Sequence, residues 1–223
     1  MENAWGTLGT MNYLAHLYLA GSDDEARLGN FLGDFVKGTL DRQRDRYSAA
    51  VLEGIACHRA IDAFTDAHPV CRRSCARLDG SVRRVAGIAI DLAYDRLLVE
   101  HWARFTDVPF SAFVGEAYAL LDRNVTSLPP RLRAVLPSIV AQDWLGSYAT
   151  WDGIELALRR VSRRFRRSPR LEGMLVGAWP SLFAAREGLS ADFLEFFPQA
   201  IAFVAARDSA QNQTVCQTLE KIR

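Results

Sequence analysis

The feature that most limits the fold of this chain is the spacing of its apolar residues, which recur every three to four positions along almost the whole length. That period is typical of helices with one buried face, whereas the strict alternation of β-strands is scarce. The sequence therefore predicts an all-α protein, a single-domain helical bundle. We expect helices over roughly 12–20, 24–37, 46–68, 70–79, 84–104, 111–124, 130–145, 151–166, 170–186 and 190–207.

The two ends of the chain differ from the part between them. Residues 1–10 precede a methionine that suits a start, and residues 208–223 are polar with little core-forming character. A chain of 223 residues is long enough for one domain with a sizeable core. We expect a helical domain over 11–207, an N-terminal extension over 1–10 and a polar C-terminal tail over 208–223.

Several residues mark where the expected helices begin or break. Asp23 and Ser111 suit N-cap positions, because their side-chain oxygens can accept hydrogen bonds from the first free backbone amides of a helix. Pro198 lies inside the last expected helix, where its missing N–H is expected to kink or split it. His68 precedes Pro69 in an expected turn, and we place it at the surface.

Composition argues against several classes of function. The net charge is +1 at pH 7, so no overall field favours nucleic acid. No apolar run approaches the roughly 20 residues that span a bilayer, and the first ten residues lack the features of a signal peptide. The four cysteines do not form the double CxxC pattern of a zinc site. We expect a cytoplasmic protein that binds neither nucleic acid nor membrane; its oligomeric state stays open.

Ionisable side chains lie among leucines and alanines in the first hundred residues, where a purely structural helix would carry apolar ones. Burying an unpaired carboxylate is costly, because loss of water disfavours its charged form. Several such groups in one region are most simply reconciled by a divalent cation that they share. The groups are His16, Asp34, His58, Asp62, Asp91 and Asp95.

The spacing of these groups supports a metal site. Residues four apart share a helix face and are separated by roughly 6 Å of rise. Three helices that each present such a pair can enclose a cation, as helical-bundle metal sites do. Carboxylates with imidazoles and no thiolate favour Mn, Mg or Fe over structural zinc. The pairs are Asn30–Asp34, His58–Asp62 and Asp91–Asp95, with Asp66 continuing the second stripe.

Structural roles stay open for the same residues. A single histidine on an apolar face is more often a hydrogen-bonded core residue than a ligand. Asp62 can pair with Arg59, and Asp95 with Arg96. His101 lies six residues beyond Asp95 and points elsewhere on its helix, so we expect it to have a supporting or structural role.

Seven arginines crowd into residues 159–170, RRVSRRFRRSPR, with no acidic residue among them. A basic patch of this kind can steer and orient an acidic protein partner. The alternative is a solvated helix face. Nucleic-acid binding is the weaker option, because Phe165 is the only aromatic residue in the run.

Five blocks of the sequence resemble the acyl carrier protein phosphodiesterase family, also called acyl carrier protein hydrolase. The resemblance runs from Met11 to about Arg207, with the blocks in the family's order. The blocks are MNYLAHLYLA (11–20), GNFLGDFVKG (29–38), GIACHRAIDAFTD (54–66), IDLAYDRLLVEHW (90–102) and, more loosely, RRSPRLEG (166–173).

The resemblance implies an all-helical fold related to HD-type metal-dependent phosphohydrolases. It also implies a divalent cation, typically Mn²⁺, with Mg²⁺ and Fe²⁺ as alternatives. The implied substrate is acyl carrier protein, and the bond cleaved joins 4′-phosphopantetheine to a serine of that protein. The relation to HD-type proteins must be structural, because this chain has no adjacent His-Asp pair.

Spacing and resemblance together give each candidate residue an expected role. The expected metal ligands are Asp34, His58, Asp62 and Asp91. The expected catalytic residues, for moving a proton or stabilising phosphoryl charge, are His16, Asp95 and Arg59. Supporting roles next to the ligands are expected for Asn30, Asp66 and His101. Contacts with the carrier protein are expected from Lys37, Arg163, Arg164, Arg166, Arg167 and Arg170.

Two other functions stay open on the sequence. One is a metal phosphohydrolase of the same helical class that acts on a nucleotide or another small phosphoester. The other is a non-enzymatic helical module that binds an acidic partner through the arginine run. An enzyme must lose turnover when Asp34 or Asp62 is replaced by alanine, whereas the module must not.

Overall fold

A computed structural model describes residues 13–222 of the protein, with side chains over residues 13–210. Within residues 13–222 the chain forms α-helices joined by short 3-10 turns and loops, with no strand. The predicted all-α fold is therefore confirmed. The extension predicted over 1–10 lies outside the described residues.

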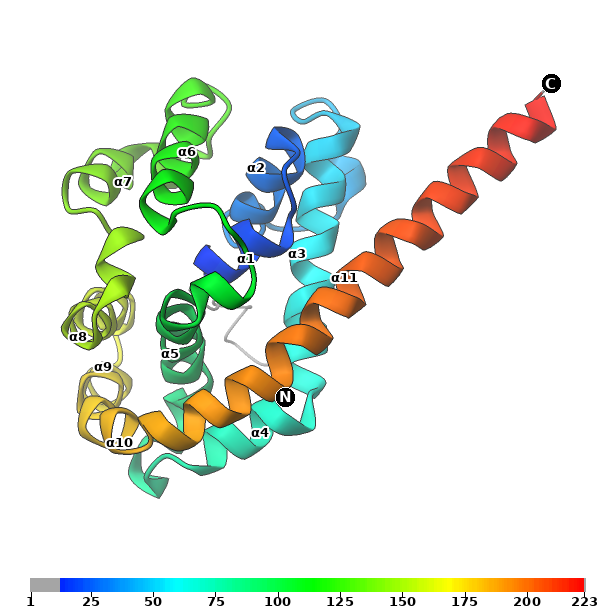
Figure 1. The fold of residues 1–223 in the computed structure, drawn as a ribbon. Helices are drawn as coiled ribbons and strands as arrows, with labels where there is room; N and C mark the ends of the chain where they lie inside the picture. Colours follow the sequence, from blue (N-terminus) through cyan, green and yellow to red (C-terminus); the bar gives the residue numbers. More distant parts are fainter. Residues whose placement is uncertain (1–12, 223) are drawn as a thin grey trace, which may run out of the picture.

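The helices succeed one another with short connections, and Figure 1 shows them wrapped around α5. Their bounds are α1 (Tyr13–Leu19), α2 (Asp24–Leu32), α3 (Ala49–Ala67), α4 (Pro69–Ala76), α5 (Ala86–Glu100), α6 (Phe110–Arg123), α7 (Pro130–Ala141), α8 (Trp151–Ser162), α9 (Pro169–Gly177), α10 (Trp179–Ala184) and α11 (Arg186–Ile222).

Several helix boundaries differ from the prediction. The helix predicted over 24–37 ends at Leu32, so Asp34 lies in the turn after α2 and not on one helix face with Asn30. The segment predicted as one helix over 170–186 forms two, α9 and α10, and the missing N–H of Pro180 falls in the first turn of α10 where it is tolerated. α11 continues through Pro198 without a split and runs on to Ile222, beyond the predicted end. Figure 1 shows the end of α11 projecting from the packed body. The separate tail over 208–223 stays a prediction.

The caps of the helices are partly as predicted. Asp23 is the N-cap of α2, and its side chain accepts a hydrogen bond from the Ala26 amide at 2.8 Å. Ser111 is not an N-cap: α6 begins at Phe110, after Pro109. His68 is also not at the surface, since it is buried between α3 and α4 and its side chain accepts from the Val70 amide.

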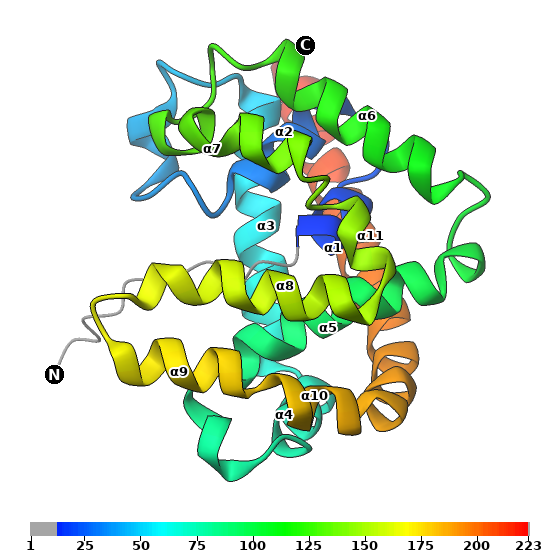
Figure 2. The same cartoon turned by 90° about the vertical axis from the view of Figure 1, so that its left-hand side faces the viewer.

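α5 is the central helix of the fold. Ten of its fifteen residues are buried, because α1, α4, α8 and α11 pack on different sides of it. Figure 2 shows α8 lying in front of α5, with α9 alongside α8. A helix buried all round normally carries apolar residues only, so the two buried aspartates of α5, Asp91 and Asp95, need an explanation.

α2 and α3 approach each other more closely than they could if the two facing residues, Gly29 and Gly54, carried side chains. A Cβ atom on Gly29 would lie 2.8 Å from the Gly54 Cα atom, and one on Gly54 would lie 2.9 Å from the Gly29 Cα atom. Both distances are below any ordinary contact, so glycine is required at this crossing. The close packing fixes α3, which carries two of the expected metal ligands, against α2.

α11 contributes apolar side chains to the core. Its first 25 residues, Arg186–Ala210, are long and apolar enough to span a membrane by length and composition alone. In this fold Phe193 and Phe197 from that stretch are buried and stack on each other, with ring centroids 5.0 Å apart. This stretch differs from the expectation that no apolar run is long enough to span a bilayer, and part of its apolar surface lies in the core.

Candidate metal centre

Side chains from two helices and one connecting segment meet beside the α2–α3 crossing. α1 brings His16, α3 brings His58 and Asp62, and the segment after α2 brings Asp34. The two imidazoles are 1% and 2% exposed, so neither is solvated. Gly33 makes room for this arrangement, because a Cβ atom there would lie 2.7 Å from the His58 Cβ atom and closer still to its ring.

The Asp62 carboxylate lies between the two imidazoles. Its Oδ1 atom is 3.1 Å from His16 Nε2, and its Oδ2 atom is 3.2 Å from His58 Nε2. The imidazole rings stack with centroids 3.8 Å apart. One ligand atom from each of these three residues lies within 4.8 Å of the others, which is the spacing that a single metal ion needs.

The orientation of His16 is set by its other ring nitrogen. His16 Nδ1 lies 3.3 Å from the Asn30 Oδ1 atom. A neutral imidazole has one N–H and both partners are acceptors, so His16 donates either to Asn30 or to Asp62 but not to both; when Nδ1–H donates to Asn30, the Nε2 lone pair faces Asp62. A lone pair facing a carboxylate is repulsive unless a cation lies between them. This pattern, a ligand imidazole fixed through its second nitrogen, is common around protein metals.

Several polar atoms near this point are buried without a hydrogen-bond partner. They include Asp34 Oδ2 and both ring nitrogens of His58. His58 Nε2 is within 3.5 Å of Asp34 Oδ1 and 3.2 Å of Asp62 Oδ2, but neither contact has hydrogen-bond geometry. Unsatisfied buried groups are rare and normally mark an ion or a water.

The charges of the cluster are strongly coupled. Burial and the neighbouring His58 lower the pKa of His16. Burial also lowers the pKa of His58, but the carboxylates of Asp34 and Asp62 outweigh it and raise that pKa to about 9. Burial raises the pKa of Asp62, yet the two imidazoles hold it below its usual range. Without a metal, one proton on His58 therefore balances the carboxylates.

The donor set fits a divalent cation. Two imidazole nitrogens and one or two carboxylate oxygens suit Mn²⁺, Fe²⁺ or Zn²⁺, whereas Mg²⁺ prefers oxygen alone. The unsatisfied atoms of Asp34 and His58 supply the lone pairs that such an ion would take up. The fit to a divalent cation therefore rests on the donor atoms of these side chains.

Comparison with known proteins identifies the family of this chain. Residues 11–200 match the sequence profile of the acyl carrier protein phosphodiesterase family. Proteins with that name from Salmonella paratyphi A, Salmonella agona and Salmonella newport are each 35% identical to this chain over 198 residues, which cover 88% of this chain and 99% of the relative. The chain belongs to the acyl carrier protein phosphodiesterase family. The resemblance seen in the sequence is thereby confirmed, and no solved structure matches the chain.

Within this family member, Asp95 lies away from the metal cluster. It is fully buried, and its oxygens accept hydrogen bonds from the backbone amides of Leu14 and Ala15 at 3.2 Å and 2.9 Å. Asp95 therefore caps the start of α1 and does not pair with Arg96, which binds Glu100. Burial raises the pKa of Asp95, and the two amides oppose that rise.

Arg59 does not pair with Asp62. Its guanidinium donates to the Val36 carbonyl at 2.9 Å, which ties the segment carrying Asp34 to α3. Lys37, in the same segment, is exposed. The structure thus gives Arg59 a contact that holds the Asp34 segment in place.

Asp91, Asp66 and His101 lie outside the three-residue cluster. Asp91 is 6% exposed and its Oδ2 atom has no hydrogen-bond partner. Burial, followed by the charges of neighbouring aspartates with Asp62 first among them, raises its pKa well above the usual range. Asp66 is exposed on α3. His101 ends α5 and its Nε2 atom lies 2.8 Å from the Ser190 hydroxyl, a structural contact with α11.

The arginine run lies on the surface at the end of α8 and the start of α9. The exposed members are Arg159, Arg163, Arg164, Arg166, Arg167 and Arg170. Arg164 reaches Tyr13, at 3.5 Å from its hydroxyl. Burial raises the pKa of Tyr13 to about 12, and the charges of both Arg164 and Asp34 act on it. Arg164, in the middle of the run, is therefore close to the metal cluster.

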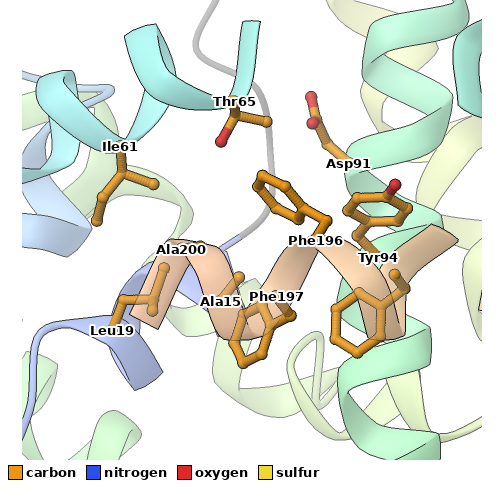
Figure 3. Close-up of a pocket in the computed structure, with 10 residues that line it drawn as sticks. Ala15, Leu19, Ile61, Thr65, Asp91, Tyr94, Phe196, Phe197 and Ala200 are labelled. Atoms are coloured by element: carbon orange, nitrogen blue, oxygen red, sulfur yellow. The ribbon is translucent and has the colours of Figure 1, made fainter. Parts of the chain in front are cut away.

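Sequence reasoning missed two features of the site. Gly33 was not singled out, although its spacing of four from Gly29 is the pattern of a close helix contact. A cavity between α3, α5 and α11 was also missed. Ile61, Thr65, Asp91 and Ala200 line it with the phenyl rings of α11, as Figure 3 shows. Its residues come from distant parts of the chain, so no local sequence pattern predicts the cavity.

Proposed function

We propose that this protein is a metal-dependent phosphodiesterase that releases 4′-phosphopantetheine from holo acyl carrier protein. Family membership supports the reaction class and the carrier-protein substrate. The observation that carries the metal dependence is the Asp62 carboxylate, whose two oxygens lie 3.1 Å and 3.2 Å from the Nε2 atoms of two buried imidazoles. We place the enzyme in the cytoplasm, where carrier proteins of this kind would be met.

We propose His16, His58 and Asp62 as the metal ligands, with Asp34 as the fourth. Compared with the sequence prediction, His16 moves from proton transfer to coordination, because its Nε2 atom lies 3.1 Å from the Asp62 carboxylate while Asn30 holds its other ring nitrogen. Mn²⁺ is the favoured ion, with Fe²⁺ next. A divalent cation there would polarise the phosphoryl oxygens and lower the pKa of water.

The reaction adds water across one phosphorus–oxygen bond. The water oxygen joins phosphorus, the bond from phosphorus to the serine oxygen breaks, and the serine takes up a proton. Asp91 Oδ2 is buried, free of partners and near Asp62, so we assign it to accept the proton that the attacking water loses. The products are a free phosphomonoester and the serine hydroxyl of apo carrier protein.

Arginine side chains of the protein act on the substrate from outside the metal cluster. Arg164 lies near Asp34 through Tyr13, so it can face the charged phosphoryl group. The other exposed arginines of the run extend this positive surface away from the site. Carrier proteins are acidic, so the run would orient the substrate over the metal cluster.

Asp95 and Arg59 act on the site through other residues in this proposal. Asp95 fixes the start of α1 and with it the position of His16. Arg59 fixes the segment that carries Asp34. The relation to HD-type phosphohydrolases remains a proposal about descent.

The test is a mass measurement on the substrate. Purified protein is incubated with Mn²⁺ and holo carrier protein, and the carrier is expected to lose the mass of 4′-phosphopantetheine. Asp62→Asn, which keeps the size of the side chain, should abolish the loss, whereas Asp122→Ala, at an exposed position on α6, should not. Retention of the prosthetic group by every sample would contradict the proposal, and turnover by the Asp62 variant would contradict the metal assignment.

A further inference from the structure

The cavity between α3, α5 and α11 has a mainly apolar lining that also includes three polar side chains, those of Thr65, Asp91 and Tyr94. It encloses about 350 Å³ between its walls, including the part open to solvent. The Phe196 and Phe197 rings, Ile61 and Ala200 form apolar walls. In Figure 3 the Thr65 and Asp91 side chains lie together on one side of the Phe196 ring. Such a lining suits a small hydrocarbon group attached to a polar one.

The cavity adjoins the metal cluster. Two of its lining residues, Ala15 and Ile61, directly precede the ligands His16 and Asp62 in the chain. Consecutive Cα atoms are about 3.8 Å apart, so the cavity wall begins next to the ligands. Asp91 links the cavity to the metal cluster, because it lines the cavity and the charge of Asp62 contributes to raising its pKa.

We infer that this cavity binds the geminal dimethyl group of the substrate's pantetheine arm; the inference rests on the proposed function. That group is the part of 4′-phosphopantetheine that is both apolar and close to phosphorus. Its quaternary carbon is three bonds away, roughly 4 Å. A phosphoryl group at the ligands therefore places the two methyl groups at the cavity.

The far end of the arm does not fit this position. Thirteen bonds, roughly 15 Å when extended, separate phosphorus from the thiol, and two amide groups lie between them. Amides that enter an apolar cavity lose their hydrogen bonds to water at a cost. The thiol, or an acyl chain on it, is therefore expected outside the cavity. Ala200 and Thr65 become specificity-determining residues for the branched carbon.

The test compares two substrates. One is holo carrier protein, and the other is the same protein loaded with an analogue whose dimethyl carbon is a plain CH₂. Two buried methyl groups correspond to roughly tenfold in kcat/KM, so the wild-type protein should favour the natural arm by about that factor. Ala200→Leu, which fills the cavity, should lower kcat/KM on the natural arm and reduce the preference to about one.

The outcomes separate this inference from the proposed function. Equal kcat/KM on both substrates in the wild-type protein overturns the cavity assignment while leaving the phosphodiesterase proposal intact. Equal losses on both substrates in Ala200→Leu also overturn it, as does a preference that follows the length of an acyl chain on the thiol. The milder Ala200→Val serves if the leucine variant does not fold. Hydrolysis of neither substrate by the wild-type protein overturns both proposals.

Discussion

Replacing Gly33 by alanine tests how the metal cluster is held together. The new Cβ atom would lie 2.7 Å from the Cβ atom of His58, whereas an ordinary contact begins at 3.4 Å. The two must therefore separate by about 0.7 Å. A Cβ atom moves only with its backbone, so rotation of the His58 ring cannot relieve the clash. α3 would have to shift against α2, but the backbones of Gly29 and Gly54 are already in close contact and restrict that shift.

A shift of this size is large for a metal site. Ligand distances tolerate about 0.2 Å, and sites lose function beyond about 0.5 Å. We expect Gly33→Ala to weaken Mn²⁺ binding by at least tenfold in isothermal titration calorimetry. We also expect it to destabilise the apoprotein by about 1–3 kcal/mol, the usual cost of overpacking. Both effects should appear together.

Gly173→Ala is the matched control. Gly173 lies within α9, and a Cβ atom there would meet nothing within 4 Å. The substitution should leave Mn²⁺ binding unchanged and stabilise the protein by about 0.5–1 kcal/mol, because alanine favours the helix. A folded Gly33→Ala protein that binds Mn²⁺ as tightly as the wild type would refute the reasoning about the glycine.

Four further predictions concern His58, Asp95 and the arginine run. The pKa of His58, raised to about 9, means that a proton competes with the metal. Mn²⁺ affinity should therefore fall by up to tenfold per pH unit below that value, with about one proton released per ion in calorimetry, and a pH-independent affinity would contradict this. In the apoprotein the same raised pKa stabilises the fold fully below the unfolded value of about 6.5, and the stabilisation is lost as pH rises through about 9. Asp95→Ala leaves two buried amides of α1 unpaired and should cost about 2–4 kcal/mol in chemical denaturation; wild-type stability would show that the cap is dispensable. Serine at four exposed arginines should raise KM for carrier protein with little change in metal content, and an unchanged KM at low salt would argue against docking by the run; the four are Arg163, Arg164, Arg166 and Arg167.

Much of the fold follows from local patterns. The apolar period locates the helices because burial of one helix face leaves a repeat in the sequence. Helix ends were less predictable, since several residue types can cap. Ser111 is a favoured N-cap type, yet Pro109 occupies that position and α6 begins at Phe110. Pro180 carried the signal for the break between α9 and α10, and that signal was overlooked.

The composition of the site was predicted better than the roles of its members. Buried ionisable groups in apolar helices pointed to the region in which His58 and Asp62 do lie together; their role as ligands stays a prediction. The same pattern could not separate Asp62 from Asp95, because both are aspartates on apolar faces. Only the folded structure brings two backbone amides to Asp95 and the Asn30 oxygen to His16. Such partners lie far apart in the chain and leave no periodic trace.

The most direct test is to locate Mn²⁺ in a crystal of the protein by anomalous diffraction. We predict one peak bonded to the Nε2 atoms of His16 and His58 and to the Asp62 carboxylate, with Asp34 within reach as a fourth ligand. A peak bound elsewhere, or none at saturating Mn²⁺ with His58 still facing Asp62, would contradict a metal centre at this position.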